Sequence, residues 1–320
     1  MKPMQLKYKP NMQVLLSTYN GALYIAEQLD SILQQEIELT ILIRDDGSKD
    51  NTLNILQQYK SKYPKYIHVI EGSNVGVIAS FWKLMQAADP QVDYFCFCDQ
   101  DDVWMVHKTN RALEQLKMIE RTDQSIPAMI FTATQLTDID LNPTVIWPGR
   151  PKKAPSFYNG LIQNIAVGAT TAFNQKARLL LLDTPSPVDQ SLILMHDWWM
   201  YITISCFGTI HFDPEPSIYY RQHGGNVVGG ESTKLQKIKK KWNSFRKHKD
   251  KKLLVQQAKE FYRVYGDQIT DSQMKQQLEA FIAPRSTWIQ RIQYLRQCQL
   301  YRQSRTEQWL FRFLILVGYI

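Results

Sequence analysis

The strongest constraint on the fold is a repeated pairing of an apolar segment with a polar, often acidic turn directly after it. Three pairs stand out: residues 12–18 before Tyr19-Asn20-Gly21, residues 39–44 before Asp45-Asp46-Gly47-Ser48, and residues 94–98 before Asp99-Gln100-Asp101-Asp102. Helical patterns separate these segments, and residues 67–70 indicate a further strand. Apolar strands that alternate with helices predict an α/β fold with a mostly parallel sheet covered on both faces.

Ligands bind outside the carboxyl ends of the strands in an open sheet of this kind. We therefore expect the functional residues in the turns after Thr18, Arg44 and Cys98. Beyond residue 128 the pattern predicts strands at 129–137 and 164–173, a helical stretch over 188–207 and an extended segment over 209–220.

The charge of the chain is divided unevenly between its two parts. Residues 1–230 carry 19 basic and 23 acidic side chains, whereas residues 231–320 carry 19 basic and 7 acidic ones. We predict a mildly acidic main body over 1–230 and a basic, amphipathic helical region over 231–320. Basic helices with aromatic residues are typical of attachment to an anionic membrane surface. Formation of a homo-oligomer through these helices and nucleic-acid binding are the alternatives.

Composition excludes several classes of protein. With 44% hydrophobic and 12% aromatic residues, the chain is not disordered as a whole. Four cysteines without a repeated Cys-x-x-Cys spacing exclude a disulfide scaffold and a zinc ribbon. The first residues contain no apolar segment of the signal-peptide kind, and no stretch reaches the ~18–20 apolar residues of a spanning helix. We therefore expect a cytoplasmic protein.

Three carboxylates within residues 99–102 favour a divalent-cation site. Closely spaced carboxylates repel one another, and a cation keeps them ionised. Mg²⁺ and Mn²⁺ prefer oxygen ligands, often one or two carboxylates plus substrate phosphates. A solvated turn with a helix-capping aspartate is the alternative. The spacing does not fit an EF-hand, and neither the G-x-G-x-x-G pattern nor the Walker lysine pattern occurs.

Three other groups have a functional and a structural interpretation. The acidic turn at 45–48 either accepts hydrogen bonds from a base or ribose or is an ordinary Asp-Gly turn. Asp197 lies in an apolar helical pattern, where burial of a carboxylate costs free energy unless it has a partner or a function. It is therefore either a general base or half of a structural Asp–His pair. Arg221 and His223 either contact a diphosphate or metal, or simply end a strand.

The motifs are more specific as an ordered set than one by one. In order they are Ser17-Thr18-Tyr19-Asn20-Gly21, Arg44-Asp45-Asp46-Gly47-Ser48, Asp99-Gln100-Asp101-Asp102-Val103-Trp104, His196-Asp197-Trp198-Trp199 and Tyr220-Arg221-Gln222-His223. This set covers roughly residues 12–230 and resembles the inverting GT-A glycosyltransferases of family 2. Within that family it is most similar to bacterial rhamnosyltransferases that build rhamnose-containing cell-wall polysaccharides in streptococci and their relatives.

The resemblance implies a GT-A catalytic domain over residues 1–230 with a helical, basic C-terminal extension over 231–320, and it implies a role for each motif. The implied donor-nucleotide residues are Thr18, Tyr19, Asp45, Asp46 and Asp99. The implied ligands of Mn²⁺ or Mg²⁺ are Asp101, Asp102 and His223. Asp197 matches the catalytic base of the family. The implied contacts of the acceptor or diphosphate are His196, Trp198, Trp199 and Arg221. His196 departs from many relatives, which have Glu before this Asp.

The implied reaction moves L-rhamnose from dTDP-L-rhamnose to a hydroxyl group of a lipid-linked or growing cell-wall polysaccharide. A UDP-hexose is the alternative donor, because thymine and uracil present the same imide edge. Nucleic-acid binding through the basic region would leave the acidic turns unexplained, so we expect no nucleic-acid partner. The expected location is the inner face of the cell membrane, with peripheral attachment.

Overall fold

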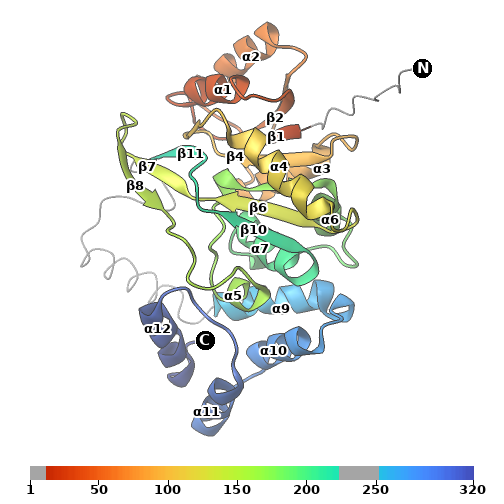
Figure 1. Ribbon diagram of the computed structural model, residues 1–320, viewed down its shortest axis with the longest axis vertical. Coiled ribbons are helices and arrows are strands. Elements are labelled where there is room, and N and C mark those ends of the chain that lie inside the picture. The colour runs from red at the N-terminus through yellow and green to blue at the C-terminus, as the bar shows by residue number, and fades with distance from the viewer. Residues whose placement is uncertain (1–11, 223–251) are drawn as a thin grey trace.

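The structure, a computed structural model, describes residues 12–222 and 252–320 of the chain. Its centre is a seven-stranded sheet in the order β10-β6-β9-β4-β1-β2-β3 (Figure 1). The strands are β1 (Met12–Thr18), β2 (Leu39–Asp45), β3 (Ile67–Glu71), β4 (Tyr94–Cys98), β6 (Ala128–Thr132), β9 (Ala172–Asn174) and β10 (Thr209–Asp213). In this sheet β9 runs antiparallel to its neighbours β4 and β6, and the other pairs are parallel. The predicted mostly parallel α/β fold is confirmed.

Helices cover both faces of the central sheet. They include α1 (Ile25–Leu33), α2 (Thr52–Lys62), α3 (Val77–Ala87) and α4 (Lys108–Glu120). Because successive strand residues point to opposite faces, β1 contributes to two separate hydrophobic clusters. Leu15 packs in the cluster that contains Phe81 of α3, whereas Val14 and Leu16 pack in the cluster that contains Leu29 of α1. The sheet is therefore buried on both sides, as its nearly continuous apolar strands predict.

A second, four-stranded sheet changes two sequence-based expectations. It consists of β5 (Val103–Trp104), β11 (Ile218–Arg221), β7 (Thr134–Thr137) and β8 (Pro143–Trp147), in that order. The single strands expected over 129–137 and 209–220 are wrong, because each segment divides between the two sheets. The strand expected over 164–173 is also wrong over most of its length. Only β9 forms in this segment, and residues 164–168 line a cavity instead.

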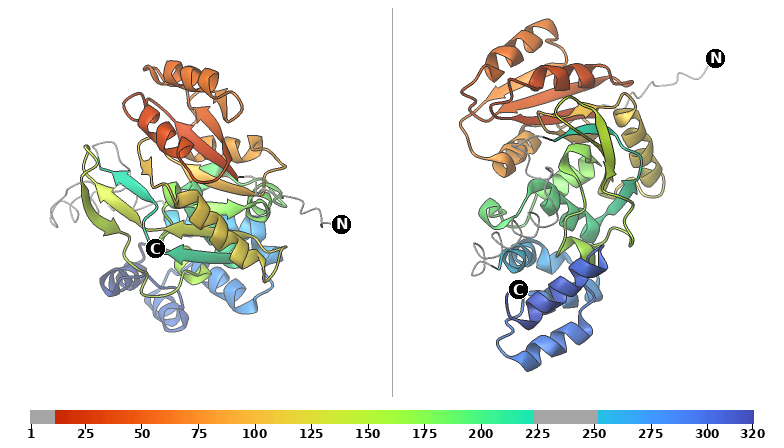
Figure 2. Two further views of the ribbon diagram at one scale, coloured as in Figure 1. Left: turned by 45° about the horizontal axis from the view of Figure 1, so that its top comes forward. Right: turned by 90° about the vertical axis from the view of Figure 1, so that its left-hand side faces the viewer.

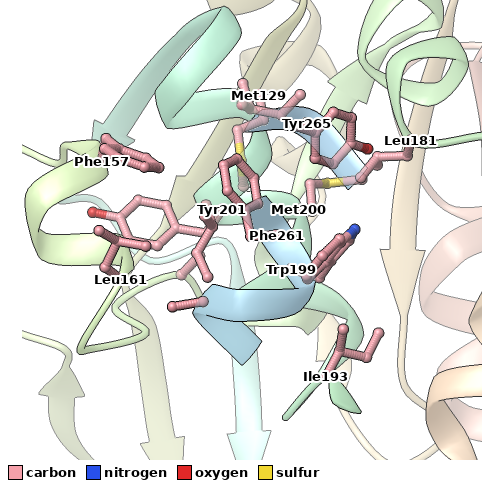
Figure 3. Packing of buried hydrophobic residues seen from close by; sticks show 14 of the residues in the cluster. Met129, Phe157, Leu161, Leu181, Ile193, Trp199, Met200, Tyr201, Phe261 and Tyr265 are labelled. Carbon is pink, nitrogen blue, oxygen red and sulfur yellow. The ribbon is translucent and has the colours of Figure 1, made fainter. Parts of the chain in front are cut away.

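The C-terminal helices pack against the rest of the protein. The remaining helices are α5 (Phe157–Gly160), α6 (Gln175–Leu182), α7 (His196–Phe207), α9 (Leu253–Tyr265), α10 (Ser272–Ile282), α11 (Trp288–Gln297) and α12 (Arg305–Leu316). Phe261 of α9 is fully buried, with its ring centre 5.7 Å from that of Trp199 in α7 and 5.6 Å from that of Phe157 in α5 (Figure 3). Helices α9–α12 gather at the end of the molecule opposite to α1 and α2 (Figures 1 and 2).

The boundary predicted at 230/231 lies outside the described residues, so the two-domain division stays a prediction. The packing of α9 on α7 joins the described part of the C-terminal region to the hydrophobic core that contains Phe81 and Phe97. None of the helices in the two described ranges is both long enough and apolar enough to cross a membrane.

We expect Phe261→Ala to lower the free energy of unfolding by ~3–5 kcal/mol, because it removes a buried aromatic ring between three helices. Chemical denaturation, followed by both tryptophan fluorescence and circular dichroism, measures this change. Phe313→Ala is the control, since Phe313 lies on the exposed side of α12, and it should change the free energy by less than ~0.5 kcal/mol. Separate unfolding of the C-terminal helices, with the rest unaffected, would contradict a shared core.

Candidate active site

The carboxyl ends of β1, β2 and β4 lie together at one edge of the sheet, because β1 pairs in parallel with both other strands. A cavity of about 1070 Å³ opens there. From this edge it is lined by Ser17, Tyr19, Asp46, Asn74, Gly76, Val77, Phe81, Asp99, Gln100 and Asp101. From elsewhere in the chain it is lined by residues 147–152, 163–168 and 194–198, and by Tyr220, Gln303, Ser304 and Glu307. The acidic turn after β4 and the start of α7, 94 residues after Asp102, therefore face one space.

Gln100 ties the turn after β4 to the turn after β1. Its Oε1 atom accepts hydrogen bonds from the Thr18 hydroxyl at 2.6 Å and from the Tyr19 amide at 2.9 Å, and its Nε2 atom donates to the Tyr19 carbonyl at 3.2 Å. A Cβ atom on Gly21 would lie 2.4 Å from Gln100 Oε1, so only glycine allows this approach. Tyr19 lines the cavity, whereas Thr18 is buried and serves as a tether. The sequence analysis did not single out Gln100.

The two aspartates at the end of β2 have different surroundings. Asp46 lines the cavity and accepts hydrogen bonds from the amides of Val75 and Gly76, each at 2.9 Å, while it forms an ion pair with the buried Arg44. Asp45 is buried outside the cavity lining, and its Oδ2 atom accepts from backbone amides of the turn at residues 47 and 48. Of the pair, Asp46 is therefore the residue that a ligand in the cavity can contact.

The acidic turn after β4 concentrates negative charge in a partly closed space. Asp99 and Asp101 line the cavity. Burial, followed by the negative charges of Asp101 and Asp197, raises the pKa of Asp99 to about 7. Asp197 is therefore close enough to Asp99 to influence its ionisation, although the two residues come from different elements. A cation bound at this turn would favour the ionised carboxylates.

The third aspartate of the turn, Asp102, is buried and does not line the cavity. Burial, together with the charges of Asp101 and Asp99, raises its pKa well above the ordinary value. Lys108 of α4 supplies a nearby positive charge that opposes this rise. The ammonium group of Lys108 is buried. It donates to the Ala169 carbonyl at 2.7 Å and lies 4.4 Å from the centre of the Trp104 ring.

Among residues 12–222 and 252–320, no three His, Cys, Asp or Glu side chains form a group that could hold a metal ion by themselves. Asp99 and Asp101 nevertheless present two carboxylates to one cavity. Mg²⁺ and Mn²⁺ are commonly bound by one or two carboxylates, with water and substrate phosphate oxygens completing the coordination. The residues present therefore fit a divalent ion that arrives with a phosphate-bearing substrate. His223, an expected ligand, lies outside the described residues.

Asp197 occupies the first turn of α7, where it lines the cavity. Its Oδ2 atom accepts a hydrogen bond from the Gly168 amide at 3.0 Å and its Oδ1 atom accepts from the Trp198 amide at 2.6 Å. Burial raises its pKa to about 6, while hydrogen bonds from Trp198, Asn164 and Gly168 oppose the rise. A carboxylate with a pKa near neutrality, held in place by backbone amides, is suited to act as a general base.

His196 is a neutral, aromatic part of the cavity wall. Its ring stacks on Phe81 with centres 3.9 Å apart and meets the edge of Phe97 at 5.0 Å. Burial lowers its pKa to about 3. Neither ring nitrogen has a hydrogen-bond partner within the part of the chain that the structure describes. An uncharged imidazole can still form a hydrogen bond with a ligand, so the expected contact of His196 with the acceptor or diphosphate stays a prediction.

Two of the residues expected to contact the acceptor or diphosphate lie away from the cavity. Trp199 is fully buried in the core, whereas Trp198, one position earlier on α7, lines the cavity. Arg221 is buried at the end of β11, where it donates to the Asp101 carbonyl at 3.1 Å and forms an ion pair with Glu27. These positions correct the expected roles: Trp199 packs the core, and Arg221 supports the acidic turn from behind.

Comparisons with known proteins agree with this geometry. The family model described as glycosyl transferase family 2 matches residues 13–178. The dTDP-rhamnosyl transferase RfbG of Shigella flexneri is 27% identical over 237 residues, which cover 70% of this chain and 77% of that protein.

Solved structures share the fold at low sequence identity. The structure of residues 1–349 of TarS from S. aureus superposes with a TM-score of 0.58 at 15% identity and covers 97% of this chain and 81% of that one. The mannosyltransferase PcManGT from Pyrobaculum calidifontis, in complex with GDP-Man and Mn²⁺, gives a TM-score of 0.51 at 16% identity, with 98% and 86% coverage. The expected GT-A-like fold is confirmed, and since the family model matches more than half of its residues, the chain belongs to glycosyl transferase family 2.

Proposed function

We propose that the protein transfers a sugar from a nucleoside diphosphate donor to an acceptor hydroxyl group with inversion at the anomeric carbon. The main observation that supports this proposal is that Asp197 and the turn at Asp99–Asp101 line one cavity. Asp197 takes the proton of the acceptor hydroxyl as its oxygen bonds to the anomeric carbon. The bond from that carbon to the diphosphate oxygen breaks, and its electron pair leaves with the diphosphate.

The donor nucleotide is proposed to lie at the edge formed by β1 and β2, against Tyr19 and Asp46. Asp101 and Asp99 are proposed to hold a divalent cation, which would offset the negative charge that grows on the leaving diphosphate. The Mn²⁺ in the complex of PcManGT supports this assignment. Asp102 is not part of the proposed metal site, since its side chain is buried and does not line the cavity.

We propose dTDP-L-rhamnose as the donor, a choice that the likeness to RfbG supports. A UDP-hexose remains the alternative, because TarS has been solved in complex with UDP-GlcNAc. Calorimetric titration and slow hydrolysis with a panel of nucleotide sugars, each with and without Mn²⁺, tests the choice. Binding of dTDP-L-rhamnose at least tenfold tighter than that of UDP-glucose and UDP-GlcNAc is the expected result, and the reverse order would favour the alternative.

We expect Asp197→Asn to reduce transfer by about 10²–10⁴-fold, the usual contribution of a general base, while the affinity for the donor persists.

The same residue predicts the pH dependence of transfer. Because its pKa is about 6 and the base must be ionised, kcat should fall as the pH drops below about 6 and level off above it. Transfer and donor titrations on wild type and variant measure both effects. Normal turnover by Asp197→Asn would remove this residue from the role.

We expect Asp101→Asn to weaken donor binding at least tenfold in the presence of Mn²⁺ and to change it little in the presence of EDTA. The physical reason is the loss of a charged oxygen ligand for the cation. Titration calorimetry with dTDP gives the affinities directly. Asp140→Asn is the matched control, because Asp140 is exposed in the loop between β7 and β8, outside the cavity lining. Equal metal dependence in wild type and Asp101→Asn would contradict the assignment.

We also propose peripheral attachment to an anionic membrane through the outer side of α12. This side presents Trp309, Leu310, Phe313 and Val317, with Trp309 73% and Phe313 57% exposed. Arg305 and Arg312 lie on the same helix, and the sequence preceding α9 is rich in lysine. Aromatic side chains combined with basic ones suit the boundary between headgroups and acyl chains. Such attachment would keep the enzyme near a lipid-linked acceptor.

We expect the double variant Trp309→Glu/Phe313→Glu to bind phosphatidylglycerol vesicles at least tenfold more weakly, since each large apolar side chain contributes ~1.5–3 kcal/mol when buried. Vesicle co-sedimentation measures this. Met118→Glu is the matched control, because Met118 is 58% exposed on α4. Attachment through α12 would be contradicted if the double variant bound vesicles as well as the wild type. It would also be contradicted if the wild type formed a concentration-dependent dimer that only the double variant lost.

A further inference from the structure

Lys108, the first residue of α4, is a buried cation that the proposed mechanism does not use. It is 3% exposed, and burial of an ammonium group costs free energy unless its surroundings compensate it. The Lys108 ammonium group donates to the Ala169 carbonyl and lies over the Trp104 ring. These two contacts join segments that are more than 60 residues apart in the chain.

The first of these segments is the acidic turn after β4. Trp104 follows this turn in β5, and Lys108 begins the helix that comes next. The positive charge of Lys108 opposes the rise in the pKa of Asp99 and of Asp102. The ammonium group is therefore close enough to the turn to act on its carboxylates.

The second segment is the turn at residues 168–170, which holds the proposed base. Gly168 donates its amide to Asp197 Oδ2 at 3.0 Å. A Cβ atom on Gly168 would lie 3.2 Å from the same oxygen, so the backbone of the turn packs directly against the carboxylate. Ala169, whose carbonyl accepts from Lys108, is the next residue of this turn. A shift of Ala169 would therefore move the Gly168 amide relative to Asp197.

Other contacts anchor the far end of the same turn. The Thr170 hydroxyl donates to the Thr132 carbonyl of β6 at 3.1 Å, and the Phe97 amide of β4 donates to the Thr171 carbonyl at 3.0 Å. These bonds tie the segment to the sheet and do not involve Lys108. Loss of the ammonium group should therefore displace the start of the turn while the segment as a whole stays folded.

We infer that Lys108 is a positioning residue, which holds the Ala169 carbonyl beside the acidic turn and thereby sets the position of Asp197 relative to the proposed metal site. The inference rests on the proposed function, because it takes Asp197 as the base. It goes further in making the separation of base and cation depend on a side chain that does not line the cavity. A displacement of about 1 Å in a catalytic site can reduce the rate by ~10²-fold.

Lys108→Met tests this role, because it removes the ammonium group and keeps an unbranched side chain for the buried site. Hydrogen–deuterium exchange of the full-length protein, with overlapping peptides across residues 165–172, should be at least about tenfold faster at the Gly168 amide. Exchange in α10 should match that of the wild type. Lys117→Met is the matched control, because Lys117 is exposed on the same helix, and it should change neither segment.

Kinetics separate a positioning role from a general loss of structure. In Lys108→Met, kcat for hydrolysis of dTDP-L-rhamnose, measured at saturating donor and Mn²⁺, should fall by about 10- to 10²-fold. The affinity for dTDP in EDTA should stay that of the wild type, because other contacts hold the nucleotide-side residues Tyr19 and Asp46. Thermal unfolding checks that the variant is folded. If it is not, Lys108→Gln, with a shorter and neutral side chain, takes its place with the same expected losses.

Three results would overturn the inference: unchanged exchange at Gly168, unchanged kcat, or exchange that becomes faster in α10 to the same degree as at Gly168. A failure of the proposed function has a different signature. If the wild type hydrolysed neither dTDP-L-rhamnose nor UDP-glucose, the proposed function would be contradicted, and the exchange at Gly168 would still decide whether Lys108 holds the turn.

Discussion

The structure depends on the placement of several carboxylates at one buried edge of a parallel sheet. Burial and mutual repulsion raise the pKa of Asp99 to about 7 and that of Asp102 well above its ordinary value. The positive charge of the buried Lys108 opposes part of this effect. On the open side, the remaining negative charge faces a cavity large enough for a nucleotide sugar. A site of this kind is most stable when a cation and a phosphate-bearing ligand occupy it together.

Neutral groups position both the turn after β4 and the carboxylate of Asp197. Gln100 joins the acidic turn to the end of β1 through Thr18 and Tyr19. The Gly168 amide holds Asp197. The C-terminal helices complete the arrangement, because α9 packs on α7 and the start of α12 closes one wall of the cavity. The start of α12 is thus part of the cavity wall, and the outer side of the same helix is the proposed contact with a membrane.

Strands β1 to β4 and the acidic turns could be predicted from the sequence, because both depend on local patterns: apolar runs, and polar residues where each run ends. The later strands could not, because the segments 129–137 and 209–220 each divide between two sheets. Which of two neighbouring residues faces the cavity could not be predicted from the sequence. Asp46 rather than Asp45, and Trp198 rather than Trp199, face the cavity, and this depends on how β2 and α7 are rotated in the packed protein. The contact of Glu307 with Gln163 joins positions 144 residues apart, and no periodicity or spacing in the chain indicates it.

A crystal structure of the complete protein with dTDP and Mn²⁺ tests the central claim most directly, because it locates the cation, the diphosphate and the base together. We predict Mn²⁺ bound between the carboxylate of Asp101 and the diphosphate oxygens, the thymidine beside Tyr19 and Asp46, and Asp197 across the cavity without a bond to the metal. Mn²⁺ bound to Asp197, or a nucleotide bound outside this cavity, would contradict it.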